Sequence, residues 1–167
     1  MNYEQFALNF NRTIVDAVSP LEIVEAVAAS LGEAFTVGRD EVAIFSFDKV
    51  REVLVFIWPH SLKSIGSIPL NAHRCLVSKT AMEKSGSLDN SFASTPHLYM
   101  FEHFLTDKEK RVPIQKIMSV PIMGGSNLKG VVQVARKGLD RDSSGADFSA
   151  ADLELLTYAA MTVADYL

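Results

Sequence analysis

The sequence predicts an α+β fold, in which an antiparallel sheet of five or six strands carries helices from both ends of the chain. Two pairs of β-prone runs, at residues 41–58 and 117–136, are each joined by a short turn-forming segment and are typical of β-hairpins. Amphipathic patterns at helical spacing precede the first hairpin and follow the second. Strands that pair along the chain, with helices segregated from them, indicate the α+β class.

The second hairpin is predicted to form the centre of the sheet. Its strands, residues 117–123 and 128–136, flank the turn Gly124-Gly125-Ser126-Asn127. Both strands are apolar at nearly every position, so we expect both faces of the sheet to be covered. Ser119 and Gln133 interrupt this apolar run, so we expect two polar side chains within the core.

Residues 1–35 are predicted to form two helices. The first covers about residues 3–18, where apolar residues recur at helical spacing: Tyr3, Ala7, Phe10, Ile14 and Val18. The second begins at Ser19-Pro20-Leu21-Glu22, a capping box with proline at the first helical position.

A C-terminal helix is predicted over residues 148–167. Ser149 and Asp152 have the spacing of an N-terminal capping pair, and Phe148 and Leu153 have that of a hydrophobic staple.

Residues 41–147 are predicted to hold the sheet and an insert at residues 59–113. Strands at 41–47 and 52–58 form the first hairpin. The insert is expected to contain, in order, an edge strand at 67–70, a helix over 72–85 that Asn71 caps and Gly86 ends, a turn-rich stretch at 86–96, and a short helix at 97–104. If the terminal helices cover one face of the sheet, this insert covers the other as a lid, and such a lid commonly leaves a cavity.

The terminal helices also show the alternating three- and four-residue spacing of helices that pair with other helices. The residues that carry it are Leu21, Val24 and Leu31 in the second helix and Leu153, Leu156 and Val163 in the last. Two interpretations stand: these residues meet a second copy of the chain in a homodimer, or they belong to the core of the single chain.

Composition narrows the class of protein. The chain has 167 residues and a net charge of −4, with no basic stripe, so we expect no nucleic-acid partner. Its single cysteine, Cys75, excludes an intrachain disulfide and fits a reducing compartment. The N-terminal residues lack the pattern of a secretory leader, and no apolar run reaches the length of a membrane span. We therefore expect a single cytoplasmic domain without a membrane partner.

Short motifs in the second half of the chain carry a family resemblance. They are Ser119-Val120-Pro121-Ile122, then Gly130-Val131-Val132-Gln133-Val134, and then Phe148 with Asp152 four residues on. In this order, and ahead of a final helix, they make residues 20–167 resemble the GAF domain family, whose small-molecule sensor modules are related in shape to PAS domains. The resemblance implies terminal helices on one face of the sheet, a ligand pocket under the insert on the other, and a non-catalytic sensory or regulatory function.

The resemblance departs from the members that bind cyclic nucleotides. Those members carry an Asn-Lys pair after the last strand, followed by Phe and then Asp-Glu. Lys137, Phe148 and Asp152 match this pattern, but Arg136 and Leu153 do not, which argues against cGMP or cAMP as the ligand. The family pattern also implies an ion pair between Lys137 and Asp152, although a staple and a cap account for Phe148 and Asp152 as well.

The predicted pocket lies between the sheet and the insert. Its candidate lining residues are Phe45, Phe47, Asn71, Leu88, Tyr99, Ser119 and Gln133. Gln133 is either a ligand contact, as in some cyclic-nucleotide-binding relatives, or an internally hydrogen-bonded core residue. The ligand and any cofactor stay unidentified at this stage. Binding is expected to favour one arrangement of the terminal helices across a homodimer, with a separate protein as the output partner.

Two other functions stand beside this one. The first is a purely structural dimerisation module with a collapsed pocket. The second is an enzyme, a relative of the GAF-fold reductases of free methionine sulfoxide, which need a second, resolving cysteine that this chain lacks. The segment His73-Arg74-Cys75 and the later histidines His97 and His103 match no metal-binding spacing, so neither a metal ligand nor a catalytic residue is predicted.

Overall fold

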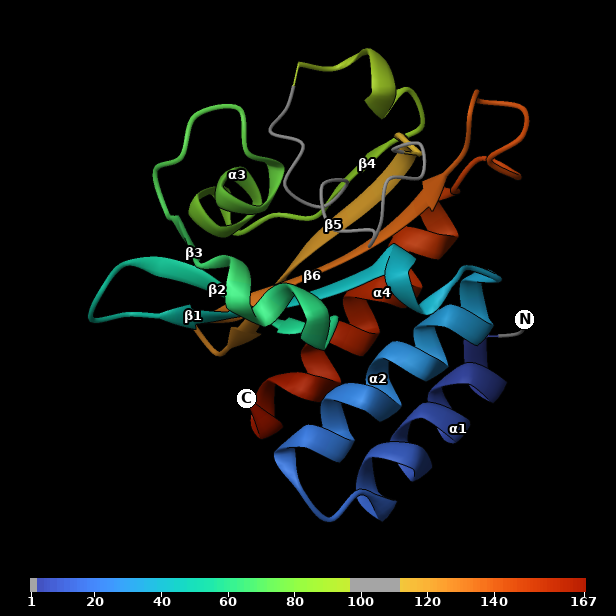
Figure 1. Ribbon diagram of the computed structural model, residues 1–167. Coiled ribbons are helices and arrows are strands. Elements are labelled where there is room, and N and C mark those ends of the chain that lie inside the picture. Colours follow the sequence, from blue (N-terminus) through green and yellow to red (C-terminus); the bar gives the residue numbers. More distant parts are fainter. Residues whose placement is uncertain (1–2, 97–111) are drawn as a thin grey trace.

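A computed structural model of the chain describes residues 3–96 and 112–167, and its centre is a six-stranded sheet (Figure 1). The strands lie in the order β3-β2-β1-β6-β5-β4, and every neighbouring pair is antiparallel. Their bounds are Val42–Asp48 for β1, Val53–Trp58 for β2, Ser67–Pro69 for β3, Ser87–Asp89 for β4, Ile114–Gly124 for β5 and Asn127–Lys137 for β6. The predicted α+β sheet is thus confirmed, with two long central strands and two short edge strands.

The central hairpin of β5 and β6 is confirmed. Its turn holds only two residues, Gly125 and Ser126, and Gly125 has the positive φ of 61° that such a tight turn requires. Every residue of β5 from Ile114 to Ile122 is buried, and so is every residue of β6 from Gly130 to Ala135. Both faces of this hairpin are therefore covered, as the continuous apolar pattern predicted.

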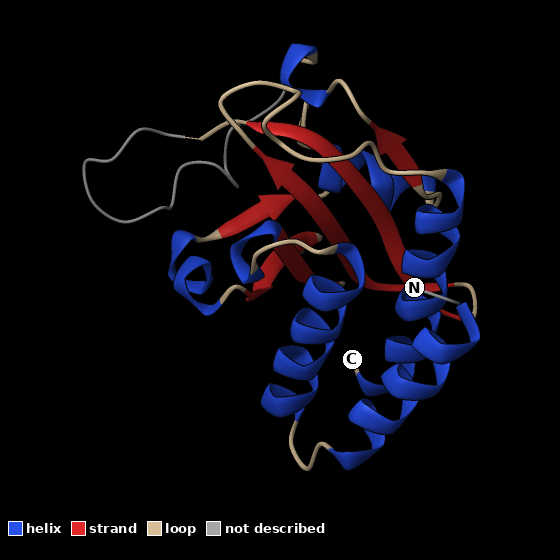
Figure 2. Cartoon of the chain, turned by 90° about the vertical axis from the view of Figure 1, so that its right-hand side faces the viewer, coloured by secondary structure: helices blue, strands red, loops and turns tan. Residues whose placement is uncertain are grey.

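Two helices, α2 at Pro20–Phe35 and α4 at Ala150–Val163, cover one face of the sheet, and α1 at Tyr3–Asp16 packs on these helices from outside (Figures 1 and 2). The predicted N-caps are present, although the box at α2 is incomplete. The Ser19 Oγ accepts a hydrogen bond from the Glu22 N–H at 3.3 Å, but the Glu22 carboxylate accepts one from the Val18 N–H at 2.9 Å. The Asp152 N–H donates to the Ser149 Oγ at 3.2 Å, and the Ser149 N–H donates to the Asp152 Oδ2 at 2.7 Å, which completes a capping box.

The predicted apolar face of α1 is confirmed in part. Phe10 and Ile14 are buried as predicted, whereas Tyr3 and Val18 are exposed and the helix ends at Asp16. Phe6, which was not predicted, is also buried and stacks on Phe10 with ring centroids 5.1 Å apart. The buried face is therefore shifted toward Phe6, whose ring buries a large apolar area.

The opposite face is covered by the insert. It contributes the helix α3 at Leu76–Glu83 and two 3-10 turns, His60–Ile65 and Phe92–Ser94. Further 3-10 turns lie at Arg39–Glu41 and Ala164–Tyr166. A second apolar cluster joins α3 to the sheet through Val77 and Ala81, which pack with Phe45 and Val131.

The insert also departs from the prediction in two places. The helix expected over 72–85 begins only at Leu76, because Arg74 takes a left-handed φ of 58° just before it. Residues 87–89 form the edge strand β4 rather than a turn. The short helix expected at 97–104 lies outside the described residues. Within the described chain, the helices all lack the length and apolar content that crossing a membrane would need.

Replacing Gly130 by alanine tests the close approach of β6 to β1. A Cβ at this position would lie 2.0 Å from the Phe45 backbone oxygen, so the sheet would have to open there. We expect Gly130→Ala to lower the free energy of unfolding by at least about 2 kcal/mol, measured by urea denaturation.

The matched control is Gly125→Asn in the hairpin turn. A Cβ there meets nothing within 4 Å, and asparagine tolerates a left-handed φ, so we expect a loss within about 0.5 kcal/mol. Equal losses for the two variants would contradict the close approach at Gly130.

Candidate ligand site

A partly open cavity of about 710 Å³ lies between α3 and β4, on the face of the sheet that the insert covers. One wall is formed by residues 71–76 together with Lys79 and Met82, and the other by residues 87–89 with Phe92, Thr95 and Pro96. Its size is that of a pocket for a small organic molecule.

Local structure holds the two walls apart. Before α3, the Ala72 N–H donates to the Pro69 oxygen at 3.0 Å, and the left-handed Arg74 then turns the chain into the helix. On the other side, β4 pairs with β5 through Leu88 and Met118. The wall on α3 and the wall on β4 are therefore fixed independently, each by its own backbone hydrogen bonds.

The walls combine an apolar surface with charged groups. Phe92 is buried, and Leu76 packs against it. His73, Arg74 and Lys79 are exposed on the wall of α3. On the opposite wall the Asp89 Oδ1 accepts a hydrogen bond from the Ser91 N–H at 2.8 Å, and its Oδ2 accepts one from the Thr95 hydroxyl at 3.0 Å. The carboxylate is thus engaged by its own loop.

The structure separates the seven predicted lining residues. Asn71 and Leu88 line the cavity. Phe47 borders a different hollow of about 720 Å³ at the other end of α3. Phe45 is 1% exposed and packs on Phe56, with ring centroids 4.3 Å apart, so it belongs to the core between α3 and the sheet. Tyr99 lies outside the described residues.

Ser119 and Gln133 are joined in a buried chain of hydrogen bonds beneath α3. The Gln133 amide donates to the Ser119 Oγ at 3.0 Å, and the Ser119 and Thr80 hydroxyls lie 2.7 Å apart. Because the Thr80 hydroxyl donates to the Leu76 oxygen at 2.9 Å, the Ser119 hydroxyl must be the donor to Thr80. This arrangement matches the second interpretation of Gln133, an internally hydrogen-bonded core residue.

Sequence reasoning missed most of the cavity wall. Leu76, Lys79 and Phe92 were not singled out, because their segments carry no motif and β4 is too short to show an alternating pattern. The segment His73-Arg74-Cys75 carries no pattern that predicts a pocket wall. Among the residues that the structure describes, no group of three or more metal-ligating side chains is present.

The ion pair predicted between Lys137 and Asp152 is not formed, because both residues have other partners. The Lys137 Nζ lies 2.9 Å from the Asp40 carboxylate. It also donates a hydrogen bond to the backbone carbonyl oxygen of Asp40 at 2.8 Å. Asp152 is held in the capping box of α4. The sequence pattern gave no signal for Asp40, which lies in a loop nearly a hundred positions away from Lys137.

The cavity wall is tied to the beginning of α4 by Asn90, which directly follows β4. The Asn90 amide nitrogen donates to the Phe148 oxygen at 2.9 Å, and the Asn90 amide oxygen accepts from the Phe148 N–H at 2.9 Å. The Phe148 ring lies in the core under the terminal helices, and the Arg136 guanidinium stacks on it at 4.6 Å. Arg136 also donates to the Phe35 oxygen at the end of α2, at 2.9 Å.

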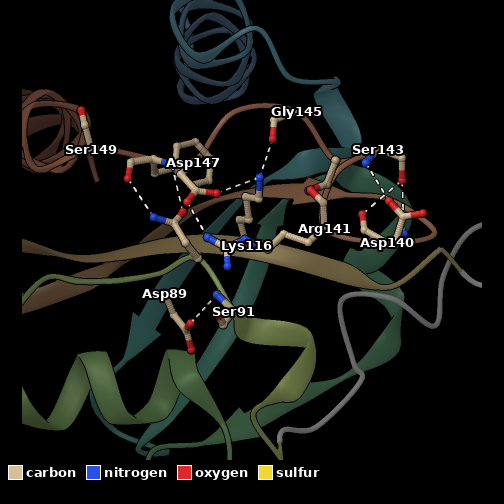
Figure 3. A network of polar contacts seen from close by, with 12 residues as sticks. Asp89, Ser91, Lys116, Asp140, Arg141, Ser143, Gly145, Asp147 and Ser149 are labelled. Carbon is tan, nitrogen blue, oxygen red and sulfur yellow. Dashed lines mark hydrogen bonds and ion pairs between the residues drawn. The ribbon is translucent and has the colours of Figure 1, made fainter.

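A second polar network holds the loop that leads into α4 (Figure 3). Lys116 projects from β5, and its side chain is only 3% exposed. Its Nζ lies 2.9 Å from the Asp147 Oδ1 and also donates to the Gly145 oxygen. Arg141 binds the other oxygen of Asp147 at 2.5 Å. These two cations lower the pKa of Asp147 below its ordinary value, with the hydrogen bond from Lys116 as the larger cause.

The residues proposed for a dimer interface lie mostly inside the single chain. Val24, Leu31, Leu156 and Val163 are buried in the cluster between the terminal helices and the sheet. Leu153 is partly buried against the same cluster, whereas Leu21 is 56% exposed. The spacing pattern therefore serves the core of the chain at these four positions, and they are not available to a second copy.

Comparison with solved structures identifies the fold. The GAF domain of an Acinetobacter phosphoenolpyruvate-protein phosphotransferase superposes with a TM-score of 0.75 at 17% identity, over 99% of this chain and 94% of that one. The free methionine-R-sulfoxide reductase of Neisseria meningitidis, solved with its substrate, has a TM-score of 0.71 at 16% identity, over 98% and 87%. A GAF domain of DevS from Mycobacterium smegmatis has a TM-score of 0.58 at 15% identity, over 89% and 92%.

The class of protein is thus defined by its architecture: the chain has the fold of GAF domains. That fold is shared by signalling domains and by methionine sulfoxide reductases, so it leaves both activities open. No family model matches the sequence, and no curated protein matches it either.

The Lys116 network predicts a specific loss of stability in acid. The pKa of Asp147 is lowered in the folded protein, so the stabilisation by its charged form is complete above pH 3.8 and is lost as the pH falls through the lower folded value. We expect Asp147→Asn to reduce the urea midpoint at pH 7 and to make progressively less difference below pH 3.8.

Asp142→Asn is the matched control, because it removes the same charge from the same exposed loop. If it changed the midpoint as much as Asp147→Asn did, the effect would be one of net charge rather than of the contact with Lys116.

Proposed function

We propose that the chain is a GAF-type sensory domain, which binds a small molecule in the cavity between α3 and β4 and reports its presence through the terminal helices. The observation that carries the proposal is the direct tie between that cavity and α4. Leu88 lines the cavity and also packs against the cluster under the terminal helices, and Asn90, two residues on, holds the backbone of Phe148 through two hydrogen bonds.

The route from cavity to helices is short and continuous. A ligand that contacts Leu88 or Asp89 changes the position or the mobility of β4, and the Asn90 bonds pass this change to Phe148. Phe148 packs against Phe35 with ring centroids 6.2 Å apart, so the start of α4 and the end of α2 respond together. A difference in ligand affinity between two arrangements of these helices would be the signal.

The proposal includes a second copy of the chain and a separate output protein in the cytoplasm. The buried residues of the spacing pattern cannot supply the dimer contact. The helix α1 presents Leu8 and Val15 on one outward face, at 68% and 72% exposure, and Leu21 lies exposed in the first turn of α2. A dimer that forms through the outer face of α1 is therefore the arrangement that we propose.

Native mass spectrometry of freshly purified protein tests ligand and dimer together. We expect an extra mass of a few hundred daltons on the chain, released on denaturation, and a subunit count of two at high micromolar concentration. If no preparation showed a bound ligand, a structural dimerisation module would explain the protein better than a sensor. If the protein bound a ligand but stayed monomeric, the proposed dimer would be wrong and the proposed ligand-binding function would stand.

The coupling step is tested by Asn90→Ala. The substitution removes both hydrogen bonds to Phe148 and leaves its buried backbone groups unpaired, which typically costs about 1–3 kcal/mol for each such group. In hydrogen–deuterium exchange we expect faster exchange at both β4 and the first turn of α4.

Ser91→Ala is the matched control, because Ser91 contributes a backbone N–H rather than its hydroxyl to the loop. The coupling route would be refuted if Asn90→Ala loosened β4 while α4 exchanged at the rate seen in the unmodified protein.

The reductase is the second candidate, since Cys75 lies in the cavity wall and solved reductases share the fold. In that chemistry the cysteine sulfur would take the sulfoxide oxygen, giving a thioether and a sulfenic acid, and external thiols would then reduce the sulfenic acid with loss of water. Cys75 is buried and is the only cysteine of the chain. An assay with free methionine sulfoxide and dithiothreitol, compared with Cys75→Ser, separates the two functions, and turnover that depends on Cys75 would favour the enzyme.

A further inference from the structure

We propose that the ligand of the cavity between α3 and β4 is an amphipathic anion, an organic carboxylate or phosphate with an apolar body. This inference rests on the proposed function, because it specifies the chemistry of the molecule bound at the same site. It is carried by the distribution of charge and apolar surface over the two walls.

The wall on α3 carries three side chains that can donate hydrogen bonds to an anion. They are His73, Arg74 and Lys79, and all three are exposed and make no hydrogen bond or ion pair within the part of the chain that the structure describes. Other exposed cations of the described chain, such as Lys63, also make no ion pair, so the lack of a partner is not by itself the signal. The signal is that three such side chains line one cavity beside an apolar surface, in a chain whose net charge is −4.

The backbone at this wall also contributes positive charge. The helix α3 begins at this wall, and its N-cap residue Cys75 provides no side-chain hydrogen bond to the first turn. The N–H groups of a helix start carry a partial positive charge, so they add to the field of the side chains. Arg74 directly precedes the N-cap residue of this helix and lines the cavity.

The described lining of the cavity holds one acidic residue, Asp89, against the two cations Arg74 and Lys79, so its charge stays positive. Each oxygen of the Asp89 carboxylate already accepts a hydrogen bond, from the Ser91 N–H and the Thr95 hydroxyl. The carboxylate is therefore engaged with its own loop on the opposite wall. An anion would bind at the α3 wall and extend its other end away from it.

The remaining surface defines the other end of the ligand. Leu76, Leu88 and Phe92 are apolar and line the space between the charged wall and β4. A fully polar anion such as inorganic phosphate would not contact these apolar side chains. A neutral hydrocarbon would not form hydrogen bonds or ion pairs with the cations. A molecule that carries both parts makes use of the whole cavity of about 710 Å³.

Three probes with the same eight-carbon chain test the inference: octanoate, octyl phosphate and 1-octanol, each titrated into the full chain by isothermal calorimetry. We expect at least one of the two anions to bind at least about tenfold more tightly than the alcohol, because hydrogen bonds to charged groups are the stronger ones. The preference should shrink with added salt, since the cations are exposed. The relative affinity of the two anions distinguishes a carboxylate ligand from a phosphate one.

Charge-removing variants locate the effect. Arg74→Gln and Lys79→Gln, singly and together, should abolish the preference for the anions and leave the affinity for 1-octanol within about twofold. Lys63→Gln is the control, since it removes an exposed positive charge outside the cavity lining. All three side chains are exposed, so these variants are expected to fold, and circular dichroism confirms this before each titration.

The outcomes separate this inference from the function on which it rests. Equal binding of all three probes, unchanged by the variants, would overturn the anionic class while the cavity stayed a ligand site. Absence of binding by any probe, in protein that is free of a co-purified ligand, would overturn this inference. The sensor itself fails only if native mass spectrometry also finds no bound mass.

Discussion

The arrangement of this protein depends on the burial of one hairpin from both sides. β5 and β6 are the two longest strands, they lie next to each other inside the sheet, and their residues point alternately to two separate cores. Val132 and Val134 contact the cluster under the terminal helices, while Val131 contacts the cluster under α3. A one-residue slip in register would exchange the two sets, so the hairpin fixes which helices go to which face. The close approach of Gly130 to β1 fixes the neighbouring strand in the same way.

The same constraint explains why the elements of this fold were largely predictable and the site was not. The hairpin and the caps of α2 and α4 each depend on residues close together in the sequence, and all of them were present. The partners of Lys137 and Lys116 depend on loops that the sheet brings together from distant positions. The cavity is of this second kind, because its walls come from α3 and from an edge strand of three residues. Periodicity cannot place such segments relative to each other.

The spacing of apolar residues in α2 and α4 illustrates a related limit. An alternation of three and four residues predicts that a helix has an apolar face, but it does not say what that face meets. Here the face of Val24 and Leu31 meets the face of Leu156 and Val163 through the core of one chain. The two helices pack against the same sheet, so the pattern that is typical of a dimer was satisfied within the monomer. What a second copy could still contact is the outer side of α1, where apolar residues remain exposed.

The two faces of the sheet thus have different roles. The face under the terminal helices has a continuous apolar core, whereas the face under the insert has two smaller clusters and a buried hydrogen-bonded chain through Thr80, Ser119 and Gln133. Polar groups buried in this way fix geometry, because leaving any of them unpaired is costly. They hold α3 in one position on the sheet, so a ligand beside α3 would meet one firm wall. The other wall is a short edge strand with few contacts of its own, and it is the one joined to α4 through Asn90. Under the proposed function, a ligand would act on this edge-strand wall, and the Asn90 hydrogen bonds would carry its effect to the start of α4.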